Sequence, residues 1–475
     1  MRRRGLLLAA GLPLMGLTPA PSPAQGMVFD ADDLAHAARL RDHALNDRHA
    51  LALVRSLSLD IGARPAGSSA DARAVAWAQQ RLVALGLQAV RAEPLALNVW
   101  RRGPASAELV APERHALVIT ALGNSVGTPD GGVEGEIACY PDFAALKADS
   151  GERARGRIVF VDQRTERSRD GSGYGRAVAA RFGSAHEAAR RGALAVVIRS
   201  IGTDSDHVAH TGAMRRPDAA TAIAAVAVSA PDADLIAGLV ARQPATGAVR
   251  LRLQVRNQSD VAVESHNVIA EVPGSDLADE VVLIGAHLDS CDLGEGAADD
   301  AAGVAIVCAA AALIQSLAGP GGRRPRRTIR VVLFANEENG FDGASAYGTR
   351  YQGQHHQLVG ESDFGAGAVY RLRSRADAAS RPAFEAMAGV LAPLGVALDA
   401  GRGSPGPDAA WLVGRHRWAG VELSQDGGDY FDVHHTENDR FDRLDTRALP
   451  HNVACWAVVA WLAAQAPGRF GVGAG

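Results

Sequence analysis

Glu280–His287 reads EVVLIGAH, and the next apolar run of the same kind is RTIRVVLFA at Arg327–Ala335. Both runs are rich in Val, Ile and Leu without polar alternation, which suits strands that are covered on both faces. Between them, 301–317 is Ala-rich and long enough for about four turns of helix. A strand–helix–strand unit of this length pairs its strands in parallel through a right-handed crossover. We therefore expect an α/β fold in which a mixed, largely parallel sheet is sandwiched by helices.

The chain of 475 residues is too long for one core, because single cores stop growing at about 250–300 residues. Turn-forming residues open a second region with GTPDGG and close it with QPATG. Inside this region GRIVFVD and GALAVVIR read as short buried strands. We expect an inserted α+β or β-rich domain at 127–250, flanked by the two parts of a catalytic domain at 25–126 and 251–475.

Residues 1–24 combine three arginines, a short apolar stretch and a tail of small residues and prolines. This pattern is typical of a signal peptide and predicts a periplasmic or secreted protein. The arginines fit both ordinary and twin-arginine export. After its removal, no later apolar run is expected to be long enough to cross a membrane.

The net charge is -4 and no long run has one sign, which argues against a nucleic-acid partner and favours a small-molecule partner. The four cysteines lie far apart without a CxxC spacing, so no thiolate metal site or redox pair is indicated. Cys308 and Cys455 lie in Ala/Val-rich helical stretches, where buried free thiols are expected.

Polar residues follow the predicted strands of the second catalytic part. His287 ends the first strand, Asp289 follows two residues later and could orient its imidazole, and Glu337 and Glu338 end the second strand. Further acids and histidines follow at later turns: Asp299, Asp300, Asp363, His434 and His435. Each alone has an ordinary explanation as a surface charge or helix cap. Because ligands of open α/β sheets bind beyond the carboxyl ends of the strands, together they predict a metal site.

Nitrogen and carboxylate ligands without thiolates favour zinc over manganese or cobalt. Two histidines and three carboxylates are too many for one tetrahedral catalytic zinc, but they suit two ions that share a carboxylate and a water. A further, uncoordinated carboxylate must accept the proton of that water. The adjacent acids Glu337 and Glu338 can divide these roles, because one can turn to the metal and the other to the substrate.

Four segments in order resemble the metal motifs of a known family, the co-catalytic di-zinc exopeptidases that comprise aminopeptidases and glutamate carboxypeptidases. The segments are GAHLDSCDLGEGAADDAAG (285–303), FANEENGFDGASAY (334–347), ESDFGAG (361–367) and DYFDVHHTEND (429–439). The resemblance is greatest to the carboxypeptidase Q (plasma glutamate carboxypeptidase) branch and covers nearly the whole mature chain.

The resemblance implies two zinc ions, with one residue shared between them and a separate glutamate as base. The implied roles are His287 and Asp363 on one zinc, Glu338 and His435 on the other, Asp299 bridging, and Glu337 as general base. Asp299 is chosen over Asp300 as the first aspartate of the motif, and His435 over His434 because it directly precedes Thr436. The family also implies dipeptides or short peptides as substrates, a protease-associated-like insertion and a possible homodimer. Cys291 departs from the branch, which usually has tryptophan there.

Three other functions compete with this one. Residues 123–127 fit G-x-S-x-G, but the turn residues that follow argue against the strand-to-helix elbow of a serine hydrolase. A non-catalytic receptor or binding module of the same fold, and a single-zinc glutaminyl cyclase, are separated from the exopeptidase by zinc stoichiometry.

Two residues keep two interpretations each. Tyr430 could hold the oxyanion or substrate or simply pack, and Asp408 could support the site or cap a helix, of which we favour the cap.

Overall fold

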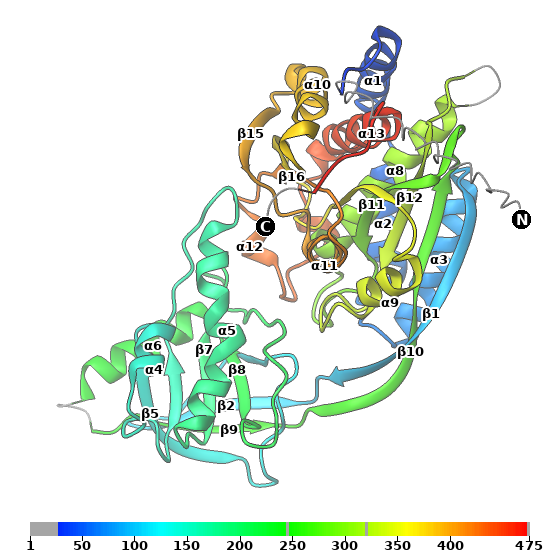
Figure 1. The fold of residues 1–475 in the computed structure, drawn as a ribbon. Coiled ribbons are helices and arrows are strands. Elements are labelled where there is room, and N and C mark those ends of the chain that lie inside the picture. The colour runs from blue at the N-terminus through cyan, green and yellow to red at the C-terminus, as the bar shows by residue number, and fades with distance from the viewer. Residues whose placement is uncertain (1–26, 244–246, 319–321, 473–475) are drawn as a thin grey trace, which may run out of the picture.

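The computed structural model describes residues 27–243, 247–318 and 322–472, so the predicted signal peptide at 1–24 lies outside the described residues. The elements form two lobes, each built on an eight-stranded sheet (Figure 1). The larger lobe contains both ends of the described chain, and the long strands β1 and β10 run from it to the smaller lobe.

The sheet of the larger lobe has the strand order β1-β10-β12-β11-β13-β16-β14-β15. The four central strands β12, β11, β13 and β16 are parallel, whereas β1, β10 and β14 run antiparallel to a neighbour. This confirms the expected mixed, largely parallel sheet. The bounds are β1 Gln88–Arg101, β10 Gln258–Val272, β11 Leu277–His287, β12 Arg327–Phe334, β13 His356–Glu361, β14 Val369–Arg375, β15 Ala397–Arg402 and β16 Gly420–Gln425.

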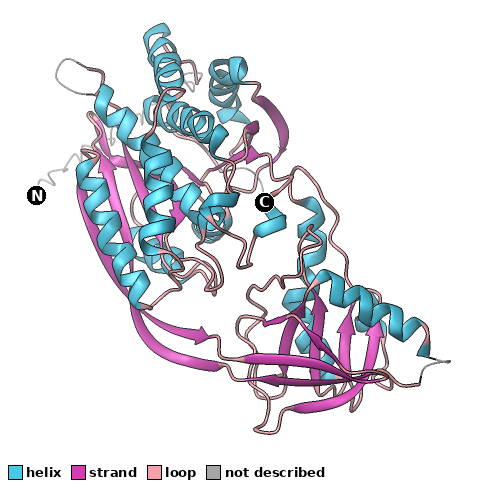
Figure 2. Cartoon of the chain, turned by 180° about the vertical axis from the view of Figure 1, so that it is seen from behind, coloured by secondary structure: helices cyan, strands magenta, loops and turns pink. Residues whose placement is uncertain are grey.

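Helices cover both faces of this sheet, as the sequence predicted (Figure 2). Side chains of β11 alternate between the two cores, with Val282 and Ile284 in the larger core and Val281 and Leu283 in the smaller one. The larger core is covered by α1 Ala31–Ala44, α2 His49–Ser56, α3 Ser69–Ala84, α8 Ala302–Leu317, α10 Arg381–Leu391 and α13 Leu449–Gln465. The smaller core is covered by α9 Asp342–Tyr351 and α11 Pro407–His416.

The expectation that no later apolar run is long enough to cross a membrane is wrong. The helical stretch Ala297–Leu317 is long and apolar enough to cross a membrane by length and composition alone. However, 94% of its most apolar window is buried inside the protein. It is apolar because α8 lies within the core, in contact with α2, α13 and the sheet.

The smaller lobe has its own sheet, in the order β3-β2-β9-β5-β6-β7-β8-β4, and its own two cores. The strands expected in GRIVFVD and GALAVVIR are present as β6 and β7. The sheet draws its strands from 105 to 255, which is wider than the 127–250 expected for the insertion. The bounds are β2 Ala105–Ala111, β3 His115–Leu117, β4 Ile119–Ala121, β5 Val133–Tyr140, β6 Ile158–Val161, β7 Ala195–Arg199, β8 Ala224–Val228, β9 Arg250–Val255, α4 Phe143–Ala148, α5 Ser172–Arg190 and α6 Ala230–Ala241.

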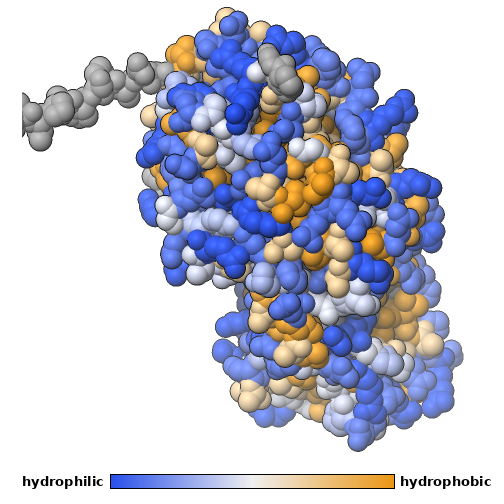
Figure 3. Space-filling model, turned by 90° about the vertical axis from the view of Figure 1, so that its right-hand side faces the viewer, coloured by the Kyte–Doolittle hydropathy of each residue, from blue (hydrophilic) through white to orange (hydrophobic). Residues whose placement is uncertain are grey.

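The two lobes are distinct in outline but touch along one side. From the side, the space-filling view shows small hydrophobic groups separated by hydrophilic residues on both lobes (Figure 3). The helix α5 projects from the smaller lobe toward the short helix α12, Tyr430–Val433, of the larger lobe (Figure 1). Tyr174 of α5 stacks on Phe431 of α12, with ring centroids 4.2 Å apart. A cavity at this contact is lined by several of the predicted site residues: Asp299, Glu337, Glu338, Asp363 and His435.

Candidate metal centre

The predicted ligands come from the carboxyl ends of adjacent parallel strands and from two loops. His287 is the last residue of β11, Glu338 follows β12, and Asp363 follows β13. Asp299 lies in the π-turn Ala297–Ala301 that leads into α8, and His435 follows α12. Parallel strands in register end at the same edge of the sheet, which brings these residues together.

The two carboxylate oxygens of Asp299 contact two separate groups of side chains. Its Oδ1 is 3.0 Å from Nε2 of His287, which in turn lies 3.7 Å from Oδ1 of Asp363. Its Oδ2 is 3.2 Å from Nε2 of His435, which lies 3.0 Å from Oε2 of Glu338. Asp299 is therefore placed between two sets of potential ligands, each with one imidazole nitrogen and one further carboxylate.

His434 also approaches the centre. Its Nε2 is 3.5 Å from Oδ2 of Asp299, and its ring stacks on that of His435 with centroids 3.6 Å apart. Asp299, His434 and His435 form one compact group of potential metal ligands, and His287, Asp299 and Asp363 form another. The contacts do distinguish the two histidines, because His435 also contacts Glu338 and we find no such contact from His434 within the described residues.

The electrostatics of the buried group fit bound cations. Burial raises the pKa of Glu337, Glu338 and Asp363. Burial opposes the charged form of His287 and His435, but neighbouring carboxylates outweigh it and raise the pKa of each imidazole well above its usual value. Oε1 of Glu338 is buried and finds no hydrogen-bond partner in the part of the chain that the structure describes. Imidazole nitrogens and carboxylate oxygens without thiolates are a donor set suited to zinc, so the residues fit this metal.

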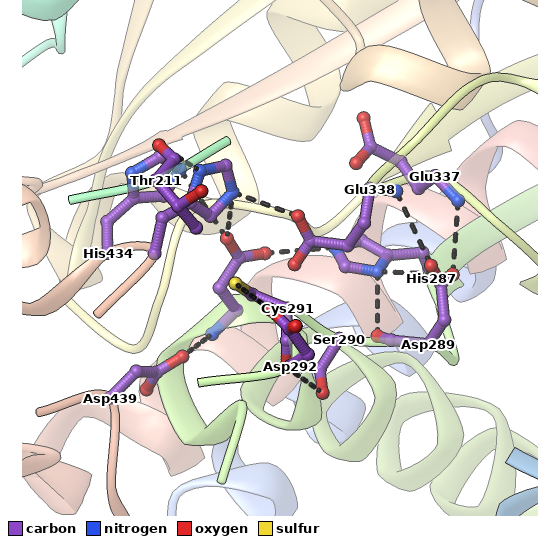
Figure 4. Close-up of polar contacts among 12 residues, drawn as sticks. Thr211, His287, Asp289, Ser290, Cys291, Asp292, Glu337, Glu338, His434 and Asp439 are labelled. Atoms are coloured by element: carbon purple, nitrogen blue, oxygen red, sulfur yellow. Dashed lines mark hydrogen bonds and ion pairs between the residues drawn. The ribbon is translucent and has the colours of Figure 1, made fainter. Parts of the chain in front are cut away.

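Asp289 holds the backbone of the two glutamates. Its carboxylate accepts hydrogen bonds from the N–H of Glu337 at 3.1 Å and of Glu338 at 3.4 Å (Figure 4). The sequence predicts that this carboxylate orients the ring of His287, but the carboxylate lies 3.7 Å from Nδ1 of that ring. The carbonyl oxygen of Asp289 is the nearer partner of that nitrogen, at 3.0 Å. Asp289 therefore contacts the end of β11 through its carbonyl oxygen and the backbone beyond β12 through its carboxylate.

Glu337 and Glu338 point in different directions, although they are adjacent (Figure 4). Oε2 of Glu338 lies 3.0 Å from Nε2 of His435, whereas no ion pair of the Glu337 carboxylate is found among the described residues. Both line a cavity of about 560 Å³ between the lobes. A carboxylate in this position is available to a substrate in the cavity.

Asp439 and Arg64 support the centre, and neither role was predicted from the sequence. The carboxylate of Asp439 accepts hydrogen bonds from the N–H of Ala298 at 2.6 Å and of Asp299 at 3.1 Å. Asp439 lies within the last quoted motif, so the motif itself was the available signal. The fully buried Arg64 braces the loop between β11 and α8 by donating to the carbonyl oxygens of Leu288, Glu295 and Gly296. Its only local sign was an arginine inside a turn-rich stretch.

Asp300 is turned away from the potential ligands. Its Oδ2 accepts from the N–H of His287 at 3.1 Å, and its Oδ1 accepts from the N–H of Gly303 at 3.0 Å. It therefore joins the end of β11 to the first turn of α8.

The interpretation of Asp408 as a helix cap is wrong. It is the second residue of α11, but both its carboxylate oxygens are buried and lack hydrogen-bond partners among the described residues. Glu361 instead accepts from the N–H of Ala409 at 3.0 Å. Burial, followed by the charges of Glu361 and Glu337, raises the pKa of Asp408 well above its usual value. It therefore lies beneath the site as a buried acid.

The cavity that contains Glu337 is lined by both lobes. Tyr430 lines it while packing against Phe364 and Phe431, with ring centroids 5.0 Å apart in each case. Six of its lining residues are aromatic: Tyr174, Phe182, Phe341, Phe364, Tyr430 and Phe431. A second cavity of about 420 Å³ adjoins Glu338 and has Cys291 in its wall.

All four cysteines lie in the described part and are free, and Cys308 and Cys455 are buried as expected.

The serine of the G-x-S-x-G pattern is not placed as a nucleophile. Ser125 is fully buried, and its hydroxyl accepts a hydrogen bond from the side chain of Asn257 at 3.0 Å. The residues that follow it lie in a loop and not in a helix. A nucleophile elbow requires an exposed hydroxyl at a strand-to-helix turn.

Comparisons with known proteins agree with this geometry. The sequence profile of peptidase family M28 matches residues 267–460. Carboxypeptidase Q of Bos taurus is 33% identical over 409 residues, which cover 85% of this chain and 83% of the relative. Carboxypeptidase Q of Homo sapiens is 32% identical over 407 residues, with the same coverage.

Solved structures show the same fold. A peptidase M28 precursor from Shewanella amazonensis superimposes with a TM-score of 0.88 at 42% identity, covering 92% of this chain and 98% of that one. A zinc aminopeptidase from Bacillus subtilis superimposes with a TM-score of 0.62 at 17% identity, covering 89% and 96% of the two chains. At that identity the second comparison supports the fold alone.

Proposed function

The chain belongs to peptidase family M28 and is a metallopeptidase, and from this premise we propose that it is an exported exopeptidase that uses two zinc ions to hydrolyse dipeptides or short peptides. The observation that carries the proposal is the position of Asp299. One carboxylate with an oxygen in each of two ligand sets is the arrangement that a pair of neighbouring ions requires. The proposed ligands are His287 and Asp363 on one side, Glu338 and His435 on the other, and Asp299 between them.

Zinc supplies a Lewis acid that lowers the pKa of a water molecule towards about 7. The chain supplies the proton transfer. Glu337 lines the cavity beside the ligand sets, so we assign it the role of general base that accepts a proton from the attacking water and donates it to the leaving amine. Asp289 holds the backbone of Glu337 and thereby positions that base. Tyr430 contributes to the wall that holds the substrate.

The substrate class follows from the cavity between the lobes. Its volume of about 560 Å³ suits a short peptide, and pockets of this size bury most of a small ligand. The six aromatic residues of its lining favour peptides with an apolar or aromatic side chain. Relatives bear both carboxypeptidase and aminopeptidase names, so substrate experiments decide from which terminus it cleaves.

Three finer assignments accompany this proposal. We assign residues 105–255, which contain the second sheet, to a protease-associated-like domain, whose residues also line the cavity that contains Glu337. We assign residues 1–24 to a signal peptide that directs the enzyme to the periplasm or the medium. A homodimer is the expected assembly by analogy with the family.

A dipeptide library tests the function directly. We expect the purified, zinc-loaded protein to cleave dipeptides with apolar side chains and to lose this activity when a chelator removes the metal. Comparing free, amino-blocked and carboxyl-blocked substrates assigns the terminus. Elemental analysis should find two zinc ions per chain, whereas one ion would favour the cyclase alternative and none the binding module. Cleavage that persists after chelation would refute the proposal.

A further inference from the structure

The loop that carries His434 and His435 belongs to the larger lobe but is also held by the smaller lobe. The backbone N–H of Thr211, in the smaller lobe, donates to the carbonyl oxygen of His435 at 3.0 Å. The carbonyl oxygen of Thr211 lies 3.3 Å from Nδ1 of the His435 ring. One residue of the smaller lobe thus holds both the backbone and the side chain of a proposed zinc ligand.

Thr211 and its neighbour His210 are themselves fixed in place. The hydroxyl of Thr211 donates to the carbonyl oxygen of Ala121 at 2.7 Å, within the same lobe. His210 has Nδ1 at 2.8 Å from the carbonyl oxygen of His434 and Nε2 at 2.5 Å from Oδ1 of Asp204. Both ring nitrogens therefore face oxygen acceptors, and the buried ring ties the smaller lobe to the histidine loop.

Gly212 permits this close approach. A Cβ atom at this position would lie 2.3 Å from the Arg181 guanidinium and 2.6 Å from Nδ1 of His435. The residue also has φ +126°, a conformation that side chains other than glycine rarely adopt. Nη1 of Arg181 lies 3.3 Å from the carbonyl oxygen of Thr211 and 3.3 Å from Nδ1 of His435, so the guanidinium and the imidazole meet at that oxygen.

Other contacts between the lobes also end on the segment 426–435. Arg167 pairs with Asp432 at 2.6 Å, and the N–H of Thr203 donates to the carbonyl oxygen of Phe431 at 3.0 Å. His287 and Asp363 lie at strand ends of the larger sheet and have no such contact in the residues described. These contacts support the half of the candidate centre that contains His435. Arg102, which donates to Thr211 at 3.1 Å, also pairs with Asp292 of the loop after β11 at 2.9 Å.

We propose that the smaller lobe completes the metal centre: Thr211 is a positioning residue that presents His435, so that zinc binding beside His435 and docking of the lobe stabilise each other. This inference rests on the proposed two-zinc site. An imidazole whose Nδ1–H is held by a carbonyl oxygen has its Nε2 lone pair free and correctly oriented for a metal. Because coupling between two events is reciprocal, zinc strengthens docking to the extent that docking strengthens zinc binding.

Hydrogen exchange of the unaltered protein tests one side of the coupling. We expect the backbone amides of 200–213 to exchange more slowly after zinc is added to the metal-free protein. The helix α4, which lies elsewhere in the smaller lobe, serves as the internal control and should exchange at the same rate in both states. Identical exchange of 200–213 with and without zinc would overturn the inference.

Substitutions test whether docking of the smaller lobe strengthens zinc binding. Zinc affinity is measured by competition with a chromogenic chelator. Gly212→Ala should weaken one of the two zinc ions by about 10- to 100-fold and leave the other unchanged, because an outer residue that orients a ligand typically contributes this much. Gly156→Ala is the matched control. It lies in the same lobe, has φ +69° and has open space for a Cβ, and it should bind both ions normally.

A second pair of variants covers the case in which Gly212→Ala does not fold. Arg167→Ala removes an ion pair between the lobes, and Arg176→Ala removes one of equal length, 2.6 Å, within the smaller lobe. We expect only Arg167→Ala to weaken one zinc ion, by about two- to fivefold. If Arg167→Ala keeps normal affinity for both ions, the coupling is refuted while the proposed function stands. If the unaltered protein binds no zinc, both fail.

Discussion

The carboxylate of Asp289, just beyond β11, accepts a hydrogen bond from the backbone N–H of Glu337, just beyond β12, at 3.1 Å. The two residues are 48 positions apart in the sequence, yet this bond ties the ends of two neighbouring strands together. This bond holds the backbone of Glu337, the proposed base, beside the proposed ligands and does not involve the carboxylate of Glu337. The geometry of the base therefore depends on Asp289.

Asp289→Asn should lower kcat by about 10- to 100-fold, a loss typical of residues that orient groups of a metal site. The amide can present a donor where the two backbone N–H groups need an acceptor, so the peptide that carries Glu337 loses its anchor. Steady-state kinetics with a dipeptide measure the loss. Asp279→Asn, an exposed change on the same strand, is the control and should leave kcat unchanged. An unaltered kcat in Asp289→Asn would remove this positioning role.

The adjacent glutamates should respond differently to the same isosteric change. Glu337→Gln should retain two zinc ions and lose turnover by about 10²- to 10⁴-fold, the range of general acid–base catalysis. Glu338→Gln should lose affinity for one zinc ion, because its carboxylate belongs to the set around His435. Elemental analysis and kcat of the two variants separate base from ligand. Equal zinc loss in both would contradict the division of roles.

His435 and His434 are neighbours with different proposed roles. His435→Ala should bind one zinc ion fewer and lose turnover, since its Nε2 contacts both Asp299 and Glu338. His434→Phe should keep both ions, because the new ring can occupy the same aromatic surroundings of Tyr174 and Phe431. Zinc stoichiometry after gel filtration distinguishes them. If His434→Phe is the variant that loses an ion, the assignment of the ligand is reversed.

His356 should make the protein sensitive to acid. Burial lowers its pKa to about 3, and its ring stacks on Trp418 with centroids 3.7 Å apart. The unfolded chain takes up a proton near the ordinary histidine pKa of about 6.5, whereas the folded chain does so only near 3. The free energy of unfolding contributed by this group is therefore complete above about pH 6.5 and decreases as the pH falls towards 3.

Urea unfolding of metal-free protein at pH 7 and pH 5 measures this decrease. His356→Gln removes the titrating group, so its free energy of unfolding should fall less between the two pH values than that of the unaltered protein. His49→Gln, an exposed change, is the control and should retain the full pH dependence. Equal pH dependence in all three proteins would exclude His356 as a source of acid sensitivity.

Much of the catalytic lobe could be predicted because its signals are local. The apolar runs that form β11 and β12 and the Ala-rich helix α8 between them have periods that depend only on neighbouring residues. Their parallel pairing then follows from the crossover rule. Placement of His287, Glu338 and Asp363 at one edge follows from the strand ends. These steps need no knowledge of distant contacts.

The supports of the site could not be predicted in this way. Arg64 contacts a loop more than 220 residues later, and Thr211 contacts a histidine 224 residues later. The role of Asp408 was misread because a carboxylate near the start of a helix has the same local pattern whether it caps the helix or lies buried. The carboxylate of Asp289 accepts from the backbone beyond β12 and not from the ring of His287, and this depends on the position of β12.

By itself the sequence determined the parallel core, the positions of the acids and histidines at its strand ends, and the resemblance that joins them into a family. All of these depend on short-range periodicity and ordered motifs. Only the tertiary structure decided that the smaller lobe reaches the centre and that Thr211 holds His435. That contact depends on the relative position of two sheets, which is set by packing summed over many residues and leaves no local pattern in the chain.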